Sequence, residues 1–592
     1  MKVLGCGSSH IKYYSIKPER EKYRIFYSLG ATIFLGLIFL ILKGENIFEM
    51  ISAIWSSIVH PFGTGRIGLT VAENYQPSLV DWINQMGKVF FWMFIAGLVF
   101  MGIELSKTIE SKKEKYTFIL LWILMFSGIL FSRISQSSLF NGTNFISQAF
   151  YIIGILAFLG YSFKLCIDKK IQIRPELIVI SIWMFFMLIS SRSAIRFFFV
   201  LTSFVVFSSA FFVVKCFEYW KREKEEIIKF LLVIVLILGI IGSVYSIAGF
   251  YKSSNAQAKV IGPSADLQWQ KTMKWVRENT PEKSLFIHWW DYGHWITYLG
   301  ERRVVTDGGH ANTYWDHLIG RYLLTTPYPY TALSLMKSHE VNYLLIDPSD
   351  LGKYGAYSKI AGDDNNDRFS QIPSFLIDES QTRETINTTL RLYRGGTGVD
   401  QDIIYEDKFI PGPTYDEAGN PTYNAQIGAV ILETDKNSLK KIEGIFLYGG
   451  EQIRIPIRYI YLENKIVDLN VGIDAVFYTM PLIDEQKIDG LGAGLYLSPK
   501  VSKSLFAQLY LMNDAFGNYP TLKLVHSELD SVNSQLRNGG INVGDIVYYQ
   551  GFRGPIKIWE VQYPKDLISR DEFRSISGSY AEFDNLQVKE FK

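Results

Sequence analysis

Hydrophobic residues are unevenly distributed along this chain. Up to about residue 250 they form long runs separated by short basic loops, and after that they are interspersed with polar residues. A bilayer core needs ~20 mostly apolar helical residues, so the first pattern predicts membrane-spanning helices. We expect about seven of them, over residues 25–42, 89–103, 116–131, 145–165, 177–190, 197–214 and 230–247.

The loops between these predicted spans alternate in their content of Lys and Arg. Cations are concentrated in residues 17–24, 107–115, 169–174 and 221–224. Because short loops rich in Lys and Arg stay on the cytoplasmic side, these segments are expected inside. The loop 44–88 and everything after residue 253 are then expected outside. The sequence therefore predicts a multi-pass protein of the cell membrane with an extracytoplasmic soluble part.

The soluble part has two patterns. Apolar spacing predicts helices at 265–278, around 315–323 and at 332–338, with strands at 284–288, 303–306 and 341–346. This alternation predicts a small α/β core with functional loops at the strand ends. Beyond residue 371, β-branched and aromatic residues predict strands at 429–433, 453–462, 465–469 and 475–480. Pro456 makes the second of these an edge strand or a broken one.

The expected fold is thus a polytopic α-helical membrane domain followed by an external α/β core with a β-rich C-terminal region. The expected domain bounds are 1–252, 253–370 and 371–592. The formal net charge of the 592 residues is only +2, which gives no electrostatic reason to expect nucleic acid as a partner. The three cysteines, Cys6, Cys166 and Cys216, form no metal-binding or disulfide pattern.

The sequence Trp289-Trp-Asp-Tyr-Gly293 is unusual at the end of a predicted strand. Two adjacent tryptophans are compatible with a core anchor or a contact with the membrane interface. They are also compatible with a pocket for a small hydroxylated group, in which the rings pack a methyl group and Asp291 accepts the hydroxyl hydrogen bond. Such a pocket discriminates, because a ligand without the hydroxyl leaves a buried acceptor unpaired.

This five-residue motif resembles the signature of the catalytic subunit of archaeal and eukaryotic oligosaccharyltransferases. In that family the Trp-Trp-Asp trio binds the Ser or Thr two residues after the acceptor Asn. The resemblance implies this role for Trp289, Trp290 and Asp291. The style of the motif also favours an archaeal source.

A second motif of the family, Asp-x-x-Lys-x-x-x-Met, lies about 60 residues downstream of the first and beside the same pocket. Asp350-Leu-Gly-Lys353-Tyr-Gly-Ala-Tyr357 is similar to it, with Tyr357 in place of the usual Met. The resemblance implies that Asp350, Lys353 and Tyr357 help to bind the acceptor sequon, with Ile360 as a further contributor at the methyl contact.

Two single charges complete the candidate site. Glu73 lies in the predicted outer loop; it is either a solvated carboxylate or, by resemblance, the family's catalytic Glu that clamps the acceptor amide near the metal. Arg196 begins an apolar helix; it is either an interfacial arginine that snorkels or a cation facing a cavity. It resembles a helix-end arginine that in bacterial relatives contacts an acidic residue before the acceptor Asn.

The resemblance implies an enzyme, an inverting glycosyltransferase of protein N-glycosylation. Its substrates are a lipid-linked oligosaccharide, on dolichol phosphate or pyrophosphate, and a polypeptide carrying Asn-X-Ser/Thr. The implied cofactor is Mn²⁺ or Mg²⁺, with Glu73 near it or in indirect contact. The family's Asp-x-Asp motifs, which hold the metal, are not found before Glu73. We therefore expect this chain to supply the acceptor-binding half, either as part of a split enzyme with a separate N-terminal-half protein or as a truncated sequence.

Two alternatives remain open at this point. One is another membrane glycosyltransferase that uses a polyprenyl-phosphate sugar, with the tryptophans binding sugar. The other is a non-catalytic membrane receptor or scaffold with an external β-rich domain. Binding of an Asn-X-Thr peptide that depends on its Thr and on Asp291 distinguishes the first interpretation from both alternatives.

Overall fold

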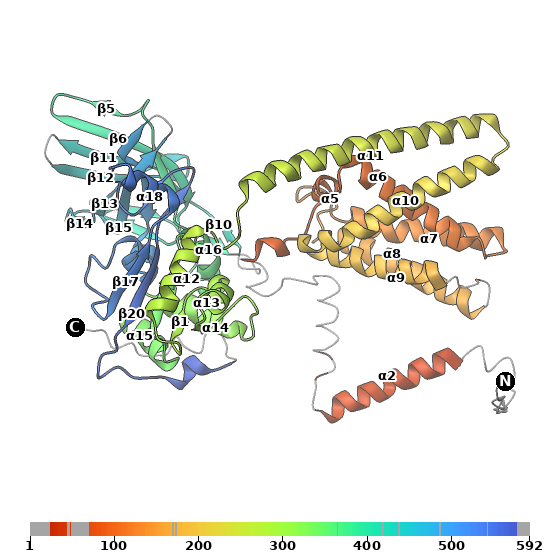
Figure 1. Cartoon of the computed structure of the whole chain (residues 1–592), viewed down its shortest axis with the longest axis horizontal. Coiled ribbons are helices and arrows are strands. Elements are labelled where there is room, and N and C mark those ends of the chain that lie inside the picture. The colour runs from red at the N-terminus through yellow and green to blue at the C-terminus, as the bar shows by residue number, and fades with distance from the viewer. Residues whose placement is uncertain are drawn as a thin grey trace, which may run out of the picture. The chain divides into compact units, whose positions relative to one another are not determined.

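The computed structural model of the chain forms two compact units, Met1–Ile261 and Gly262–Lys592 (Figure 1). The structure describes residues 24–43, 46, 48, 70–168, 171, 175–363, 365–415, 420–435, 438–484, 487–541 and 543–576. Most of the predicted outer loop before residue 70, and the basic residues 17–23, lie outside these described residues.

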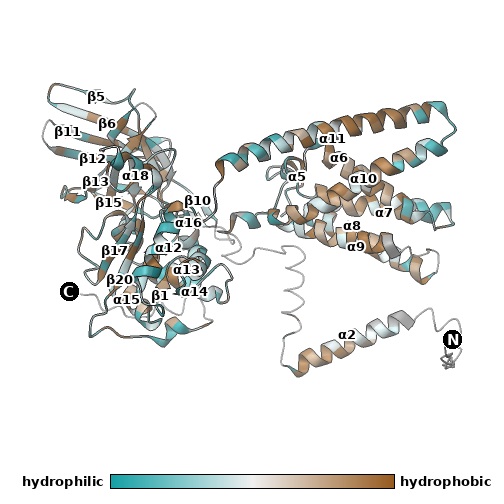
Figure 2. Cartoon of the chain, in the orientation of Figure 1, coloured by the Kyte–Doolittle hydropathy of each residue, from teal (hydrophilic) through white to brown (hydrophobic). Residues whose placement is uncertain are grey.

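The first unit is helical. Its helices are α2 (Arg24–Leu42), α5 (Leu79–Met86), α6 (Lys88–Ser106), α7 (Lys112–Phe131), α8 (Phe145–Ile167), α9 (Pro175–Ser193), α10 (Phe198–Arg222) and α11 (Glu226–Val260), with the short turns η1 (Ala72–Asn74) and η2 (Ile195–Phe197). Apolar residues cover most of these helices (Figure 2).

Five helical segments are long and apolar enough to cross a membrane: Lys88–Ser106, Lys112–Phe131, Phe145–Ile167, Ile195–Arg222 and Glu226–Val260. The other two predicted spans are also helical, but their apolar parts, Gly30–Leu42 and Leu177–Ser193, are shorter. The chain is therefore a multi-pass membrane protein, as predicted.

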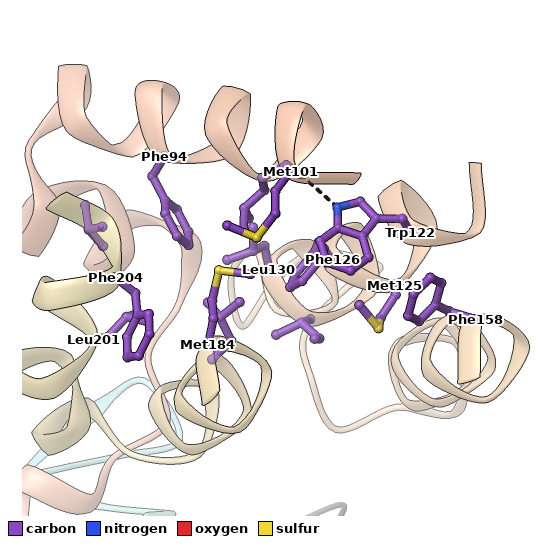
Figure 3. Packing of buried hydrophobic residues seen from close by; sticks show 14 of the residues in the cluster. Phe94, Met101, Trp122, Met125, Phe126, Leu130, Phe158, Met184, Leu201 and Phe204 are labelled. Atoms are coloured by element: carbon purple, nitrogen blue, oxygen red, sulfur yellow. Dashed lines mark hydrogen bonds between the residues drawn. The ribbon is translucent and has the colours of Figure 1, made fainter. Parts of the chain in front are cut away.

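Helices α6 to α10 pack around one apolar cluster (Figure 3). The buried indole of Trp122 on α7 donates to the carbonyl oxygen of Leu98 on α6 over 2.8 Å, which ties these two helices together. On α10, Ser208 Oγ donates to the Phe94 carbonyl oxygen over 3.0 Å. A Cβ atom at Gly97 would lie 2.1 Å from the Ser208 carbonyl oxygen, so α6 and α10 approach closely because this residue is small.

Helix α11 is longer than its predicted span. At ~1.5 Å per residue its 35 residues measure ~52 Å, more than the ~30 Å bilayer core. It packs on α6 and α10 through Leu232 and Leu236. The helix continues past residue 247 because residues 248–260 contain only one glycine and no proline; Gly262 and Pro263 follow its end.

The second unit contains a five-stranded sheet. Its order is β17 (Leu522–Glu528), β20 (Ile556–Val561), β3 (Tyr343–Ile346), β1 (Leu285–Ile287) and β2 (Arg303–Val304). Strand β1 runs parallel to both β2 and β3, and β20 is antiparallel to β3. The accompanying helices are α12 (Leu267–Asn279), α13 (Gly293–Tyr298), α14 (Thr313–Ile319), α15 (Pro329–Ser338) and α16 (Asp350–Ala361). This is the α/β core that the sequence predicted, completed by two strands from the C-terminal region.

An eleven-stranded sheet forms the β-rich region around its own apolar core. Its strands are β4 (Ser374–Ile377), β5 (Arg383–Glu384), β6 (Thr388–Gly398), β11 (Gln426–Asp435), β12 (Leu439–Tyr448), β13 (Glu451–Leu462), β14 (Lys465–Asp468), β15 (Ile473–Ile483), β16 (Ile488–Leu497), β18 (Val547–Tyr548) and β19 (Phe552–Arg553). The ladder between β13 and β12 ends at Pro456, and pairing with β15 begins at Ile457. Pro456 therefore marks a broken ladder within one continuous strand, because it has no N–H to donate.

Shorter elements complete this unit. They are the hairpin β7 (Ile403–Tyr405) with β8 (Lys408–Ile410), the pair β9 (Thr414–Tyr415) and β10 (Pro421–Thr422), the helices α17 (Pro499–Ser502) and α18 (Ser531–Asn538), and the turns η3 (Trp290–Tyr292), η4 (Gly320–Leu324), η5 (Phe506–Leu511) and η6 (Asp571–Arg574). The strands of the C-terminal region thus contribute to both of the larger sheets of the second unit.

Candidate functional site

Strands β1, β2 and β3 run parallel, so the loops that follow them lie on one edge of the five-stranded sheet. Strand β1 leads into residues 289–293, β2 into the loop 305–312, and β3 into residues 347–353. Because the carboxyl ends of parallel strands share an edge, these loops converge although 64 residues separate Trp289 from Lys353 along the chain. This edge holds the residues of both sequence motifs.

Gly293 explains why the first motif ends in glycine. A Cβ atom at this position would lie 2.5 Å from the carbonyl oxygen of Thr306 and 2.5 Å from the Cβ atom of Asp307. The backbone of the β2 loop therefore lies against the start of α13, and a side chain at residue 293 would force the two loops apart. Glycine allows the close approach that closes this side of the site.

A chain of polar contacts joins the two motifs. The ammonium of Lys353 lies 3.2 Å from Asp291 Oδ2, and it donates to the hydroxyl of Tyr292 over 3.0 Å. That hydroxyl in turn donates to Asp350 Oδ1 over 2.8 Å. Asp350 and Lys353 share one face of α16 because they are three residues apart. The predicted pairing of the motifs is therefore present, with Asp291 partly exposed and Asp350 buried beneath it.

Two buried carboxyl groups lie under this contact chain. Asp350 Oδ2 accepts the backbone N–H of Asp347, and Asp347 Oδ2 accepts the indole N–H of Trp269 over 2.9 Å. Burial and the neighbouring charge of Asp347 raise the pKa of Asp350 to about 7, and burial also raises the pKa of Asp347. At neutral pH the pair therefore carries less than two full charges, which is how two carboxyls can be buried together.

Trp290 is one of two aromatic residues of the candidate site, with Tyr357, whose buried polar group makes no hydrogen bond to a described residue. Its indole N–H is buried and has no hydrogen-bond partner among the described residues. Its ring packs on His310, with 4.4 Å between the ring centroids, and His310 Nδ1 lies 2.8 Å from Asp316 Oδ2. Burial raises the pKa of Asp316 to about 6. The indole ring of Trp290 is thus held by its packing against His310, while its N–H group makes no hydrogen bond to a described residue.

Trp289, Tyr357 and Ile360 are buried, with 2%, 0% and 1% of their surfaces exposed. The ring of Tyr357 lies 5.4 Å from that of Trp289, and it also packs against Tyr354 and Phe506. Tyr357 and Ile360 therefore lie within the packed interior of this structure and support Trp289 from inside. Their predicted contact with a threonine methyl group stays a prediction.

A cavity of about 710 Å³ opens beside Asp291 and Lys353. This volume is within the ~300–1,000 Å³ usual for ligand pockets. Its aromatic surface comes from Trp269, Tyr292 and Trp295. Charged and polar groups accompany these rings, so the cavity can bind a ligand that carries both apolar and hydrogen-bonding groups.

The two remaining candidates, Glu73 and Arg196, belong to the first unit. Glu73 is exposed in η1, and Arg196 donates to Asn74 Oδ1 over 2.7 Å from η2. The backbone N–H of Ile195 donates to the Tyr75 carbonyl oxygen over 3.1 Å, which holds the two turns together. The structure therefore brings Arg196 next to the residue that follows Glu73, although more than 120 positions separate them.

These features define a class: a polytopic membrane protein whose second unit presents a polar, aromatic pocket at the carboxyl ends of parallel strands. Sequence comparison relates the chain to oligosaccharyltransferases, which confirms the resemblance of the motifs. It is 41% identical over 96 residues to dolichyl-phosphooligosaccharide-protein glycotransferase 1 of Pyrococcus furiosus, covering 16% of this chain and 10% of that protein. The same-named protein of Pyrococcus horikoshii is 32% identical over 177 residues, covering 28% of this chain and 17% of that protein.

A eukaryotic relative shows a similar match. A dolichyl-diphosphooligosaccharide–protein glycosyltransferase subunit of rice is 32% identical over 98 residues, covering 17% of this chain and 12% of its own length. The matched segments therefore cover only small parts of these relatives, and their activities come to this chain only as a proposal. No family model matches the chain.

Solved structures include archaeal oligosaccharyltransferase AglB from Archaeoglobus fulgidus in complex with an inhibitory peptide and a dolichol-phosphate. The comparison covers 86% of this chain and 71% of that one at 12% sequence identity, with a TM-score of 0.37. A TM-score this low carries no functional argument.

Several residues of the site were not singled out by the sequence. Tyr292 connects the two motifs, Asp347 and Trp269 complete the buried network, and His310 with Asp316 supports Trp290. Asp347 follows directly after β3, and this position at a strand end was an available signal. No signal in the sequence pointed to Trp269 or His310, because only the fold brings these two residues to the site.

Proposed function

We propose that this chain binds the acceptor polypeptide of an oligosaccharyltransferase reaction, in which a lipid-linked oligosaccharide is transferred to the Asn of Asn-X-Ser/Thr. The observation that carries the proposal is the pairing of an unused donor with an available acceptor. Among the described residues the buried indole N–H of Trp290 has no partner, and the adjacent carboxylate of Asp291 is partly exposed at the cavity, although Trp290 itself is not one of the lining residues.

In the proposal one ligand hydroxyl group serves both residues, which requires the Trp290 N–H to become accessible from the cavity. Its oxygen accepts the hydrogen bond of Trp290, and its own hydrogen is donated to Asp291. Lys353 holds the carboxylate in place, since its ammonium lies 3.2 Å away. A ligand with Ala in place of Ser or Thr gives Trp290 no acceptor and Asp291 no hydroxyl donor, which is how the site would select its ligand.

Glu73 would bind the N–H groups of the acceptor carboxamide, and Arg196, held at Asn74, would lie at the same outer turn of the first unit. In the proposed transfer the amide nitrogen attacks the anomeric carbon of the donor sugar, the bond to the lipid phosphate breaks so that the phosphate leaves with the lipid, and one N–H proton of the amide passes to the carboxylate of Glu73. The proposal assigns the soluble unit and η1 to the extracytoplasmic side of the membrane, where the basic loops predict them. The lipid carrier, dolichol phosphate or pyrophosphate, is proposed together with the donor.

The predicted Mn²⁺ or Mg²⁺ is a separate part of the proposal. The described residues contain no group of three or more His, Cys, Asp or Glu side chains that could hold a metal ion. The residues described here thus do not by themselves fit a metal site, and no step is assigned to a metal.

The test measures peptide binding by the full chain in detergent micelles. A fluorescent peptide containing Asn-Ala-Thr is compared with one containing Asn-Ala-Ala, using the wild-type chain and Asp291→Ala. Leaving buried polar groups unpaired costs ~1–3 kcal/mol, so we expect the Ala peptide and the variant each to lose about tenfold to a hundredfold in affinity. Asp468→Ala is the control, because this exposed carboxylate pairs with Arg458 away from the cavity. Equal binding of both peptides by the wild-type chain would disprove the proposal.

A further inference from the structure

The cavity beside Asp291 has walls that take no part in recognising a hydroxyl group. Asp266 lies at the start of α12, Asp530 at the start of α18, and Phe552 and Arg553 form β19. These residues come from elements far from both motifs in the sequence. A serine or threonine side chain at Asp291 therefore leaves most of this cavity to other parts of the ligand.

Acidic groups outnumber basic groups on the cavity surface. Asp266, Asp291 and Asp530 contribute carboxylates, whereas Lys353 and Arg553 contribute the cations. Lys353 lies 3.2 Å from Asp291, and Arg553 lies 4.0 Å from Asp530. Among the residues that the structure describes, Asp266 forms no ion pair. The cavity therefore retains negative charge that a ligand cation can neutralise.

Both peripheral carboxylates have a fixed position. Asp266 Oδ1 accepts the backbone N–H of Trp269 over 2.9 Å, and Asp530 Oδ1 accepts that of Val532 over 2.8 Å. Each caps a helix N-terminus with one oxygen; the second oxygen of Asp266 is left available to a ligand, whereas Oδ2 of Asp530 lies 4.0 Å from Arg553. The charge is thus held in a defined place and is not carried on a mobile side chain.

The remaining surface is mixed, with polar lining residues such as Gln268, Ser349 and Ser374 beside apolar ones. Trp295 packs edge-on against Trp269, with 4.8 Å between ring centroids, and Leu351, Ile372 and Phe552 also line the cavity. Apolar patches alternating with charges of both signs suit the side chains and backbone of a polypeptide. A ligand of uniform charge or an uncharged one would leave either the carboxylates or the cations unpaired.

We propose that this cavity binds the acceptor residues that follow the hydroxy amino acid, and that it favours a basic side chain there. This rests on the proposed function, which places the hydroxyl group at Asp291. The acceptor Asn precedes the hydroxy residue and has to reach the transfer chemistry, so the chain after that residue is the part free to run along the second unit. Its basic side chain would lie between the carboxylates of Asp266 and Asp530.

The test uses the full chain in detergent and three peptides that share Asn-Ala-Thr. One ends at the Thr as an amide, one continues with Gly-Lys-Lys, and one continues with Gly-Glu-Glu. At low ionic strength we expect the lysine peptide to bind about threefold to tenfold more tightly than the glutamate peptide, and we expect added salt to reduce the difference. Equal affinities of the three peptides would overturn the inference.

A double variant tests the assigned carboxylates. Asp266→Ser with Asp530→Ser removes both charges but keeps a good helix cap at each position. We expect it to bind the lysine and glutamate peptides equally and still to require the Thr. Asp468→Ser with Asp474→Ser is the matched control, since it removes two exposed carboxylates that pair with Arg458. Unchanged discrimination in the Asp266/Asp530 variant would overturn the inference.

The two proposals fail in different ways. If the wild-type chain binds Asn-Ala-Thr and Asn-Ala-Ala peptides equally, the hydroxyl site is wrong and the proposed function fails. If binding requires the Thr but the affinity does not depend on the residues after it, the proposed function stands and only the further inference is wrong.

Discussion

Replacing Trp290 by Phe separates a ligand-binding role from a structural one. The indole N–H of Trp290 is buried with no partner among the residues that the structure describes, which costs the folded protein ~1–3 kcal/mol. Phe removes this penalty, but the smaller ring loses roughly 40–50 Å² of apolar contact, or ~1 kcal/mol. The two effects oppose each other, so we expect stability to change by ~1 kcal/mol or less, in either direction.

Binding should respond differently from stability. A hydrogen bond to the ligand hydroxyl is worth ~0.5–1.5 kcal/mol, so the Asn-Ala-Thr peptide should bind about twofold to tenfold more weakly to Trp290→Phe. The affinity of an Asn-Ala-Ala peptide should not change, because it makes no such bond. Peptide fluorescence anisotropy and thermal unfolding of the detergent-solubilised chain measure the two quantities.

Trp269→Phe provides the matched control. The indole N–H of Trp269 donates to buried Asp347 Oδ2 over 2.9 Å, so its loss leaves a buried carboxylate oxygen unpaired. We expect this variant to lose ~1–3 kcal/mol of stability. The reasoning about Trp290 is refuted if Trp290→Phe destabilises the chain as much as Trp269→Phe does, or if it binds the Thr peptide with wild-type affinity.

Three further predictions concern the same edge of the sheet. Gly293→Ala should destabilise the chain by ~1–3 kcal/mol in thermal unfolding, because its Cβ would lie 2.5 Å from the Thr306 carbonyl oxygen; a wild-type melting temperature would contradict this. Lys353→Met should cost ~1 kcal/mol or less of stability, since its ion pair with Asp291 is partly solvated, but it should weaken binding of the Thr peptide several-fold; unchanged affinity would refute the role given to Lys353. The folded chain holds the proton of Asp350 up to about pH 7, whereas the unfolded chain releases it near pH 3.8. The stabilisation from this proton is therefore complete below pH 3.8 and is lost as the pH rises towards 7; Asp350→Asn should flatten this decline in denaturation curves, and an unchanged slope would count against the assignment.

Much of the architecture could be predicted from local patterns. Runs of apolar residues predicted the membrane helices, because a bilayer requires length and hydrophobicity within one segment. Alternation of strands and helices predicted the α/β core, and Pro456 predicted a broken ladder that the structure shows between β12 and β15. Predictions of helix ends were weaker: α11 extends to Val260, because its polar C-terminal residues still favour helix.

The sequence could not predict which distant strands join the core. Strands β17 and β20 lie in the five-stranded sheet with β1, β2 and β3, although about two hundred residues separate β20 from β3. Strand pairing over such distances depends on the packing of the whole unit. The local pattern of a strand shows that it is a strand but does not specify which other strand it pairs with.

By itself the sequence determined a polytopic membrane protein with a Trp-Trp-Asp motif and an Asp-x-x-Lys motif at strand ends. Only the tertiary structure decided how these motifs are arranged: Tyr292 joins Lys353 to buried Asp350, while the indole N–H of Trp290 finds no partner in the described part of the chain. The reason is physical. The sequence contains the type and spacing of the residues. The burial of a side chain and its hydrogen-bond partners depend on which segments the fold brings into contact.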